Sequence, residues 1–168
     1  VVTGLSAMSS LGLTYRESWE NLLAGKSGIA PITHFDASDY ASRIAGELKG
    51  FSAEDYGIPA KQARRMDRFV QIAVASAIML VRDSGYVINE KTAPRTGVLV
   101  GVGLGGLKTI EDFHTRLMEA GPNKISPFMI PMLIANMAPG QISIFTGATG
   151  PNMVVTSACA SSLHAIGY

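Results

Sequence analysis

The sequence predicts an α/β fold with a mixed or parallel sheet. Apolar runs rich in valine, which are typical of buried strands, occur at residues 96–102 and 153–157. Stretches with the length and pattern of helices lie before and between these runs, at residues 60–84 and 107–119. Strands that alternate with helices along a chain favour a sheet with helices packed on its faces.

The first third of the chain predicts one helix and little sheet. We interpret Val1–Gly4 as the end of a strand that runs into a glycine turn. Thr14 and Glu17 have the spacing of a capping box, in which each side chain bonds the other residue's free backbone N–H. A helix therefore starts there, and it ends near Gly25. Scattered glycine, proline and aspartate after it indicate loops, with one short strand at residues 43–48.

The middle of the chain predicts a long helix followed by a buried strand. Pro59 suits the start of a helix and Gly85 its end, so we predict a single helix over residues 60–84. The first half of this segment is basic and the second half apolar. The strand at residues 96–102 comes next, and the glycines at residues 103–106 end it.

The last third predicts shorter elements around one more strand. After the helix at residues 107–119, Pro127 and Pro131, with Pro139 next in the chain, indicate irregular turns and a short helix over residues 126–138. Residues 141–146 fit either a helix or a strand. The run at residues 153–157 is the second strand, and a helix begins at Cys159.

Composition limits the classes of protein that the chain can represent. Its 168 residues suffice for one domain with a core. Fourteen Lys and Arg against thirteen Asp and Glu leave a net charge of +1, which gives no general attraction to nucleic acid. A single cysteine excludes an intramolecular disulfide. No apolar stretch reaches the roughly 18 residues of a membrane span, and no secretory signal is visible, so we expect a cytoplasmic protein.

The one cysteine lies where the last predicted strand meets the last predicted helix. In Met153–Gly167 an apolar run meets small residues, then Cys159, then a helix-compatible stretch. Free backbone N–H groups at a helix start stabilise an anion such as a thiolate, and the N–H of Cys159 can bind the oxyanion of an attacked carbonyl. Free cysteines are more often small buried side chains. The spacing alone slightly favours that second interpretation, because no base is visible.

Two other patterns carry less weight. Gly101–Gly106 matches G-x-G-x-x-G, but the strand before it does not start the chain and no acidic residue ends a following strand about 20 residues on, so we reject a dinucleotide site. Of the three histidines, His164 lies about 140° around the helix from Cys159 and is expected to pack or to bond the helix. His34 and His114 lie in loop and helix-surface contexts. We assign no catalytic role to any histidine.

Several separate motifs together resemble the β-ketoacyl synthases. The segment T-S-A-C-A-S-S-L-H-A-I-G is similar to their active-site signature, with Ser157 and Ser162 as small-for-small departures. Six further motifs occur in the family order: V-V-T-G-L at 1–5, R-R-M-D-R-F at 64–69, G-V-G-L-G-G at 101–106, S-P-F-M-I-P at 126–131, N-M-A-P-G at 136–140 and G-P-N at 150–152. The pattern is closest to the synthase II branch of bacterial fatty-acid synthesis.

The resemblance implies a fold and a reaction. The fold is the thiolase fold, two related α/β halves in a layered α-β-α-β-α arrangement, of which this chain covers the first half. Residues 1–168 are then one N-terminal synthase domain, truncated at its C-terminus. Cys159 accepts an acyl chain from acyl carrier protein, and decarboxylation of malonyl carrier protein supplies the carbanion that extends it. No metal or organic cofactor is implied, and the family is homodimeric.

The same resemblance assigns further residues. Leu104 matches an aliphatic gate of the acyl pocket, and Met129 matches a position at the end of that pocket. Basic residues that match Lys61, Arg64 and Arg65 help to dock acyl carrier protein. Together with Arg68 they recur at helical spacing, which predicts one positive face. Without the resemblance, an ordinary solvated helix face is the better interpretation of that pattern.

Three alternatives stay open. The chain resembles, more distantly, polyketide synthases and thiolases of the same superfamily, and a non-catalytic chain-length partner keeps the fold but loses the nucleophile. The motifs at 126–131 and 136–140 favour the fatty-acid branch, and the presence of Cys159 favours an enzyme. The two histidines that assist decarboxylation in the family lie beyond Tyr168. We therefore expect this chain alone not to catalyse the condensation.

Overall fold

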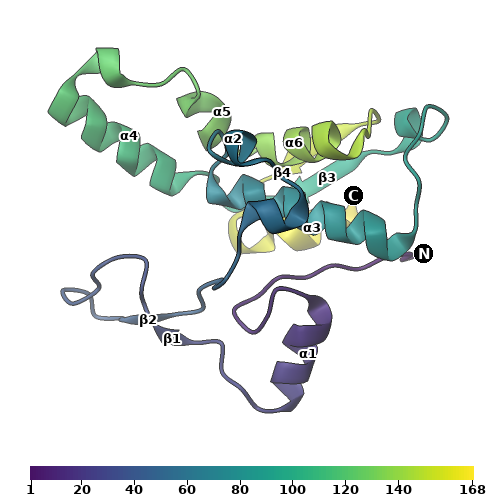
Figure 1. The fold of residues 1–168 in the computed structure, drawn as a ribbon, viewed down its shortest axis with the longest axis horizontal. Coiled ribbons are helices and arrows are strands. Elements are labelled where there is room, and N and C mark those ends of the chain that lie inside the picture. Colours follow the sequence, from purple (N-terminus) through teal and green to yellow (C-terminus); the bar gives the residue numbers. More distant parts are fainter. The chain divides into compact units, whose positions relative to one another are not determined.

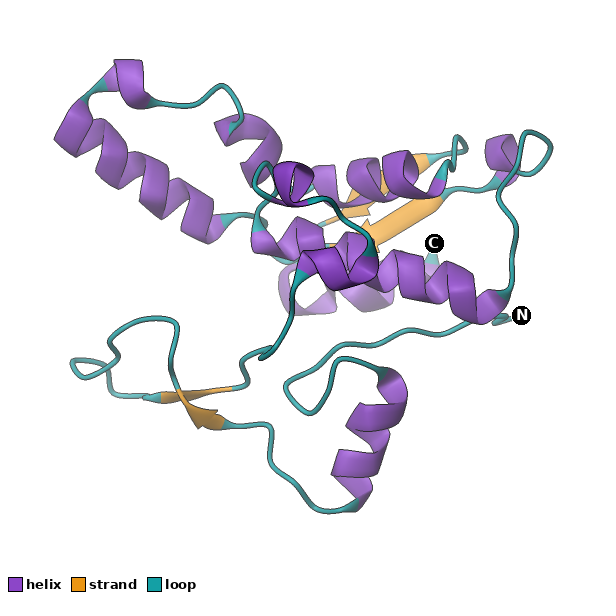
Figure 2. Ribbon diagram, viewed as in Figure 1, coloured by secondary structure: helices purple, strands orange, loops and turns teal.

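A computed structural model describes residues 1–168, which form two compact units, Val1–Ser52 and Ala53–Tyr168. Figure 1 traces the chain and Figure 2 shows its helices and short strands. The second unit holds the predicted α/β pattern and the cysteine. None of the helices is both long and apolar enough to cross a lipid bilayer.

The helix of the first unit, α1, runs over Tyr15–Leu23. Thr14 Oγ1 accepts a hydrogen bond from the backbone N–H of Glu17 at 3.1 Å, as the capping-box spacing predicts. The Glu17 carboxylate reaches back to the N–H of Leu13 at 2.8 Å rather than to that of Thr14. Gly25 follows with a φ of +67°, a conformation that glycine adopts without strain. The predicted helix is confirmed.

The rest of the first unit is a small hairpin. β1 (Ala30–Pro31) pairs antiparallel with β2 (Ile44–Ala45), so the strand predicted at 43–48 is confirmed over two residues only. The strand predicted at Val1–Gly4 is wrong, because no neighbouring strand bonds that segment.

The carboxylate of Glu47 closes the loop between these strands. It accepts hydrogen bonds from the N–H and the hydroxyl of Thr33, at 2.9 and 2.6 Å, and from the N–H of His34 at 3.1 Å. Thr33 thereby lowers the pKa of Glu47 to about 2. Because the pKa of Glu47 is lower in the folded chain than in the unfolded chain, the ionised carboxylate stabilises the fold at neutral pH. This stabilisation is lost as the pH falls towards 2.

Residues 60–84 of the second unit form two helices, α2 and α3, where the sequence predicted one. The single-turn helix η1 (Ala53–Tyr56) precedes α2 (Ala60–Ala63), and α3 then runs over Arg68–Ser84. The prediction of a continuous helix over 60–84 is wrong, because Asp67 has an extended backbone (ψ 158°) and caps α3 instead of continuing α2. Its Oδ1 accepts from the N–H of Phe69 at 3.2 Å.

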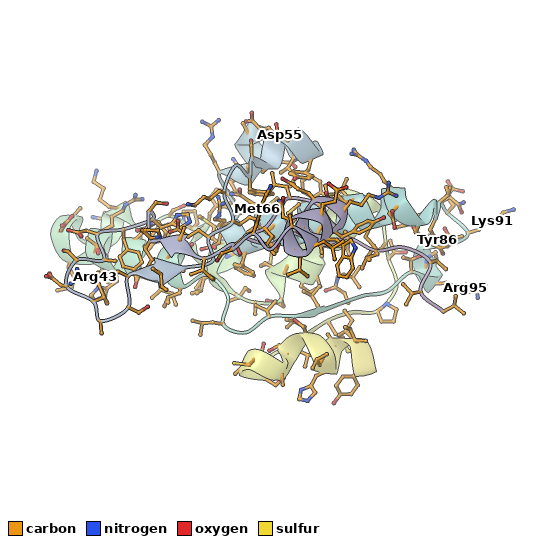
Figure 3. The ribbon with its side chains drawn as sticks, turned by 90° about the horizontal axis from the view of Figure 1, so that it is seen from below. Arg43, Asp55, Met66, Tyr86, Lys91 and Arg95 are labelled. Atoms are coloured by element: carbon orange, nitrogen blue, oxygen red, sulfur yellow. The ribbon has the colours of Figure 1, made fainter.

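A two-stranded parallel sheet forms the centre of the second unit. β3 (Val98–Gly101) pairs with β4 (Asn152–Val155) in the register Val98 to Asn152, as the apolar runs predicted. α6 (Met137–Thr146) packs on both strands and on α3, and α7 (Ser161–Gly167) packs on both strands as well. In Figure 3, α7 lies on the opposite side of the strands from α3. The sheet is therefore covered by helices on both faces.

The core of this unit lies between α3 and α6. Val70 and Val74 of α3 and Ala138 and Pro139 of α6 are fully buried there. Residues 141–146, which fitted either helix or strand, are helical. The other elements are η2 (Ala93–Arg95), α4 (Leu107–Ala120), η3 (Pro122–Lys124), α5 (Met129–Leu133) and η4 (Ala158–Ala160).

Candidate functional site

Cys159 lies in the turn that joins β4 to α7. The strand ends at Val155, η4 carries Cys159 at its centre, and α7 begins at Ser161. Its side chain is exposed. The interpretation of Cys159 as a small buried hydrophobe is therefore wrong for this structure, whereas the predicted position between a strand and a helix is confirmed.

The residue before the cysteine has a strained backbone. Ala158 has a φ of +51°, and it is the only non-glycine residue of the chain with a positive φ. A residue with a Cβ in the left-handed region costs about 1–2 kcal/mol. Such strain persists only where the surroundings hold it, and it is concentrated at functional sites. The reversal at Ala158 turns the chain so that Cys159 faces outward instead of continuing the line of β4.

A buried hydroxyl holds this turn in place. Ser161 is 2% exposed, and its Oγ accepts from the N–H of Ser157 at 2.8 Å. The same hydroxyl donates to the carbonyl of Ala158 at 2.7 Å. One side chain thus bonds the backbone on both sides of the strained residue. The carbonyl of Ala158 also accepts from the backbone N–H of Ser161, so the loss of this hydroxyl leaves one backbone group, the N–H of Ser157, without a partner.

A glycine lets α7 approach the sheet closely. A Cβ built on Gly101, the last residue of β3, would lie 2.4 Å from the carbonyl carbon and oxygen of Ser161. Real Cβ atoms do not come this close to a backbone. The helix that follows the cysteine therefore packs at a distance that only glycine allows at position 101.

The turn leaves one backbone donor free. Ala160 N–H bonds the carbonyl of Ser157 at 3.1 Å, but the N–H of Cys159 has no acceptor within the chain. A free N–H beside a nucleophile can bind the negative oxygen that forms on an attacked carbonyl. The imidazole of His164 has another partner, since its Nδ1 lies 2.7 Å from the hydroxyl of Ser157. This agrees with the expectation that His164 bonds its own helix region.

The two residues predicted for an acyl pocket lie at neighbouring elements. Leu104 is 67% exposed in the glycine turn after β3, and Met129 is the half-buried first residue of α5. A backbone hydrogen bond from Gly106 N–H to the carbonyl of Leu133, 3.0 Å long, joins that turn to α5. The structure thus links the two segments, while the roles of Leu104 and Met129 stay predictions.

The predicted basic residues do not form one helical face. Lys61 lies within α2, Arg64 caps its end, Arg65 lies in the turn that follows, and Arg68 starts α3. The break at Asp67 therefore overturns the predicted stripe. Two of these residues, Arg64 and Arg65, nevertheless line one pocket, together with side chains from α4 and α5. Lys61 does not line it.

Sequence reasoning missed the connection that Asp67 makes. Its Oδ2 accepts from the hydroxyl of Thr109 at 2.6 Å, and Thr109 is buried on α4. An added Cβ on Gly106 would lie 2.9 Å from the same oxygen. Asp67 thus fixes the basic turn against the start of α4. An aspartate directly before an apolar helical run is a known capping signal, and it could have revealed the helix break.

A comparison with protein families gives a match over the whole chain. The family described as "Beta-ketoacyl synthase, N-terminal domain" matches residues 1–168. The match includes the strand, the strained turn and the cysteine. The chain belongs to the β-ketoacyl synthase family.

Two curated relatives of this β-ketoacyl synthase chain carry the same name. The chain is 47% identical over 168 residues to "3-oxoacyl-[acyl-carrier-protein] synthase 2" of Vibrio cholerae, covering 100% of this chain and 40% of the relative. It is 50% identical over 167 residues to the protein of that name from Synechocystis, covering 99% of this chain and again 40% of the relative. The chain therefore spans about two fifths of the length of these relatives.

Solved structures confirm the predicted fold. A β-ketoacyl synthase from Burkholderia phymatum superposes with a TM-score of 0.82 at 26% identity, over 100% of this chain and 41% of that one. The ishigamide ketosynthase/chain length factor gives 0.79 at 28% identity, over 93% and 39%. The thiolase-like α/β fold and the N-terminal position of this chain within it are both as the sequence predicted.

Proposed function

We propose that a protein containing this chain catalyses the decarboxylative condensation of an acyl thioester with malonyl-acyl carrier protein in fatty-acid elongation. The observation that carries the proposal is the exposed Cys159 in a strained turn, beside a backbone N–H without an acceptor. The shared name of the curated relatives, 3-oxoacyl-[acyl-carrier-protein] synthase 2, supports the substrate class.

The first half of the reaction uses residues of this chain. The thiolate of Cys159 attacks the carbonyl carbon of the acyl thioester, and the electron pair moves to the oxygen, where the N–H of Cys159 stabilises it. The tetrahedral intermediate then expels the carrier's thiolate. The acyl group is left on Cys159 as a thioester of similar energy, so the enzyme divides one difficult step into two.

The second half completes the condensation. Malonyl carrier protein loses CO2, and the carbanion formed attacks the carbonyl carbon of acyl-Cys159. The Cys159 thiolate leaves, and the product is a 3-oxoacyl chain that is two carbons longer and bound to the carrier. In the family, two histidines assist the decarboxylation, and we expect this chain alone to lack condensation activity.

Acylation of the cysteine tests the proposal directly. The protein to be tested is a polypeptide as long as the relatives that contains this chain, called the full-length synthase below. Incubation with acyl carrier protein loaded with a saturated acyl chain should add one acyl mass to the peptide that holds Cys159. Cys159→Ala should remain unmodified, and malonyl carrier protein should release the acyl group as product. A wild-type protein that gains no acyl mass would refute the function.

The acyl chain should extend from Cys159 towards Leu104 and Met129. The support is the hydrogen bond that joins the glycine turn of Leu104 to α5, together with the family resemblance. Leu104→Ala should raise kcat/KM for long acyl chains relative to short ones, because a smaller side chain opens the gate. An unchanged ratio between chain lengths would remove Leu104 from this role.

We further propose that acyl carrier protein docks at Lys61, Arg64 and Arg65. All three side chains are exposed, and two of them line one pocket. A ketosynthase solved in complex with its acyl-carrier protein, AntDE:AntF, shares the fold of this chain, at a TM-score of 0.82. Arg64→Glu should weaken carrier binding about tenfold at low salt. Unchanged affinity would contradict the docking site.

The full-length synthase is expected to be a homodimer. The support is the outer edge of β4, which pairs with β3 on one side only, and the exposed side chain of Met153 on that strand. Sedimentation equilibrium should give twice the monomer mass, and Met153→Lys should shift the equilibrium to monomer. A monomeric wild-type protein would contradict this expectation. The cytoplasmic location also stays a prediction.

A polyketide synthase is the second candidate function. The ishigamide ketosynthase/chain length factor supports it, since its structure superposes over 93% of this chain. The identity of 28% is lower than the 47–50% shared with the curated synthases. Transfer of a saturated acyl chain to Cys159 and a single round of elongation favour the fatty-acid function, whereas repeated condensation without reduction favours the polyketide one.

A further inference from the structure

A pocket of about 300 Å³ lies among the turn at the end of α2, the helix α4, and α5 with the segment before it. Three of its lining residues are arginines: Arg64 and Arg65 from the turn after α2, and Arg116 from α4. The only acidic residue in the lining is Asp112. Both oxygens of Asp112 lie within 2.9 Å of Lys108 Nζ. The pocket therefore has an excess of positive charge.

None of the three arginines has an acidic partner within the chain. The ion pairs of Lys108 with Asp112 and of His34 with Glu47 involve none of them. Protein guanidinium groups are always charged, and they pair best with planar oxyanions that accept two parallel hydrogen bonds. The one carboxylate of the pocket, Asp112, is paired with Lys108, so the three arginines form a site that lacks an anion of its own.

Aromatic rings hold two of the arginines in position. The guanidinium carbon of Arg65 lies 4.5 Å from the ring centre of Phe128, and that of Arg116 lies 5.4 Å from the ring centre of Phe113. Both rings also line the pocket. Stacking of this kind restricts side chains that would otherwise be mobile. Less conformational entropy is then lost when an anion binds.

We propose that this arginine pocket, with Arg116 as its third cation, receives a carboxylate side chain of the acyl carrier protein. The proposal rests on the proposed function, because it names the part of the carrier that meets Arg64 and Arg65. Sequence periodicity could not include Arg116, which is more than 50 residues from Arg64 in the chain. The fold of α4 against the turn at Asp67 brings them to one pocket.

The chemistry of the lining favours a carboxylate side chain over a phosphate. Protein phosphate sites commonly use backbone N–H groups at a helix start. Arg116 instead lies in the third turn of α4, and the polar residues that line the pocket are the three arginines, Asp112, Thr109 and Ser126. Phe113, Phe128 and Met132 add apolar surface. The methylene groups of an aspartate or glutamate can pack there while its carboxylate meets the guanidinium forks.

Charge reversal at Arg116 in the full-length synthase tests the proposal. Arg116→Glu should raise the Kd for acyl carrier protein about tenfold at low salt, because it replaces attraction by repulsion. Arg95→Glu is the matched control, because it makes the same change of charge in η2, outside the lining of the pocket (Figure 3). It should leave the Kd unchanged. Acylation of Cys159 by a small soluble acyl thioester should be equal in all these variants.

The outcomes separate this proposal from the docking proposal itself. If Arg64→Glu weakens binding and Arg116→Glu does not, docking at the basic turn stands and the arginine pocket is overturned. If neither has an effect, both proposals fail. Because Arg64 and Arg116 would face one carboxylate, the double reversal should weaken binding by less than the product of the two single effects. A loss equal to that product contradicts a shared pocket.

A second arm distinguishes the source of the anion. The carrier protein without its prosthetic group carries no phosphodiester, but it keeps its acidic side chains. Arg116→Glu should weaken binding of this form about as much as binding of the complete carrier. If Arg116→Glu weakens binding of the complete carrier alone, the pocket binds the phosphodiester of the prosthetic group, and the proposal of a carboxylate is overturned.

Discussion

The turn at Cys159 and the arginine pocket differ in what fixes them. The turn is held by contacts within itself: the hydroxyl of Ser161, the strained backbone of Ala158 and the close approach of α7 to Gly101. The pocket is lined by three cations without acidic partners, which come from separate elements. The contacts that hold the first region lie within this chain, whereas we propose that another molecule pairs with the charges of the second.

This difference indicates which property a single substitution should change in each region. A change in the turn alters packed backbone and should affect stability and chemistry together. A change in the pocket alters exposed charge and should affect association while leaving the fold intact. The comparison would be contradicted by a substitution in the turn that affects only association, or by one in the pocket that affects only stability.

The largest effect is expected for Gly101→Ala. The added methyl group would overlap the backbone of Ser161, so α7 must move away from β3. Forcing extra volume into a packed contact costs about 3 kcal/mol. Denaturant unfolding of the full-length synthase should show a loss of that order, and acylation of Cys159 should fall in parallel.

Gly103→Ala is the matched control for that substitution. Its added methyl group would meet only the carbonyl oxygen of Ala158, at 3.7 Å, an ordinary contact. Its midpoint of unfolding should remain close to that of the wild type. Equal stability of the two alanine variants would show that the close approach of α7 does not hold the turn.

A smaller loss is expected for Ser161→Ala. The substitution removes both hydrogen bonds across Ala158 and leaves the N–H of Ser157 without an acceptor, which costs about 1–3 kcal/mol. The reaction of Cys159 with acyl carrier protein should slow, because the turn is less well held. Ser162→Ala, an exposed neighbour, is the control, and a similar loss in both variants would argue against a special role of the buried hydroxyl.

Thr109→Val tests the hydrogen bond that connects α4 to the turn of Arg64 and Arg65. The valine keeps the shape of threonine but cannot donate to Asp67, so the turn of Arg64 and Arg65 is less firmly fixed to α4. The expected destabilisation is about 1 kcal/mol. Carrier affinity should fall as well, whereas the exposed Thr115→Val should change neither quantity. Unchanged carrier affinity in Thr109→Val would separate the hydrogen bond from docking.

The smallest effect is expected for Lys61→Glu. Lys61 is exposed on α2 and does not line the arginine pocket. Its charge should therefore act at a distance, and the reversal should weaken carrier binding only about twofold, with the difference disappearing at high salt. Titrations at two salt concentrations measure this. A loss as large as that of Arg64→Glu would extend the docking surface beyond the pocket.

The sequence predicted the strand, the cysteine and the following helix because each depends on local features. Apolar runs, small residues and glycines are visible along the chain, so the positions of β3, β4 and Cys159 could be predicted. The strain at Ala158 could not, because alanine gives no sign of a positive φ.

The basic residues show the limit of periodicity. Helical spacing placed Lys61, Arg64 and Arg68 on one face, but the cap made by Asp67 interrupts the helix. Arg116 joins the pocket only through tertiary packing, which no spacing reveals. Patterns within one element therefore predict its presence, while a site built from several elements requires the fold.

The left-handed backbone at Ala158 has a consequence for protein chemistry. An alanine of the opposite chirality prefers a positive φ, so D-alanine at position 158 should keep the methyl group and relieve the strain of the L-residue. The bond from Ala158 to Cys159 is also a junction that native chemical ligation can form, because a peptide thioester joins directly to an N-terminal cysteine. A semisynthetic mirror-image substitution at one residue is thus accessible, and it would show whether the enzyme depends on that strain or only tolerates it.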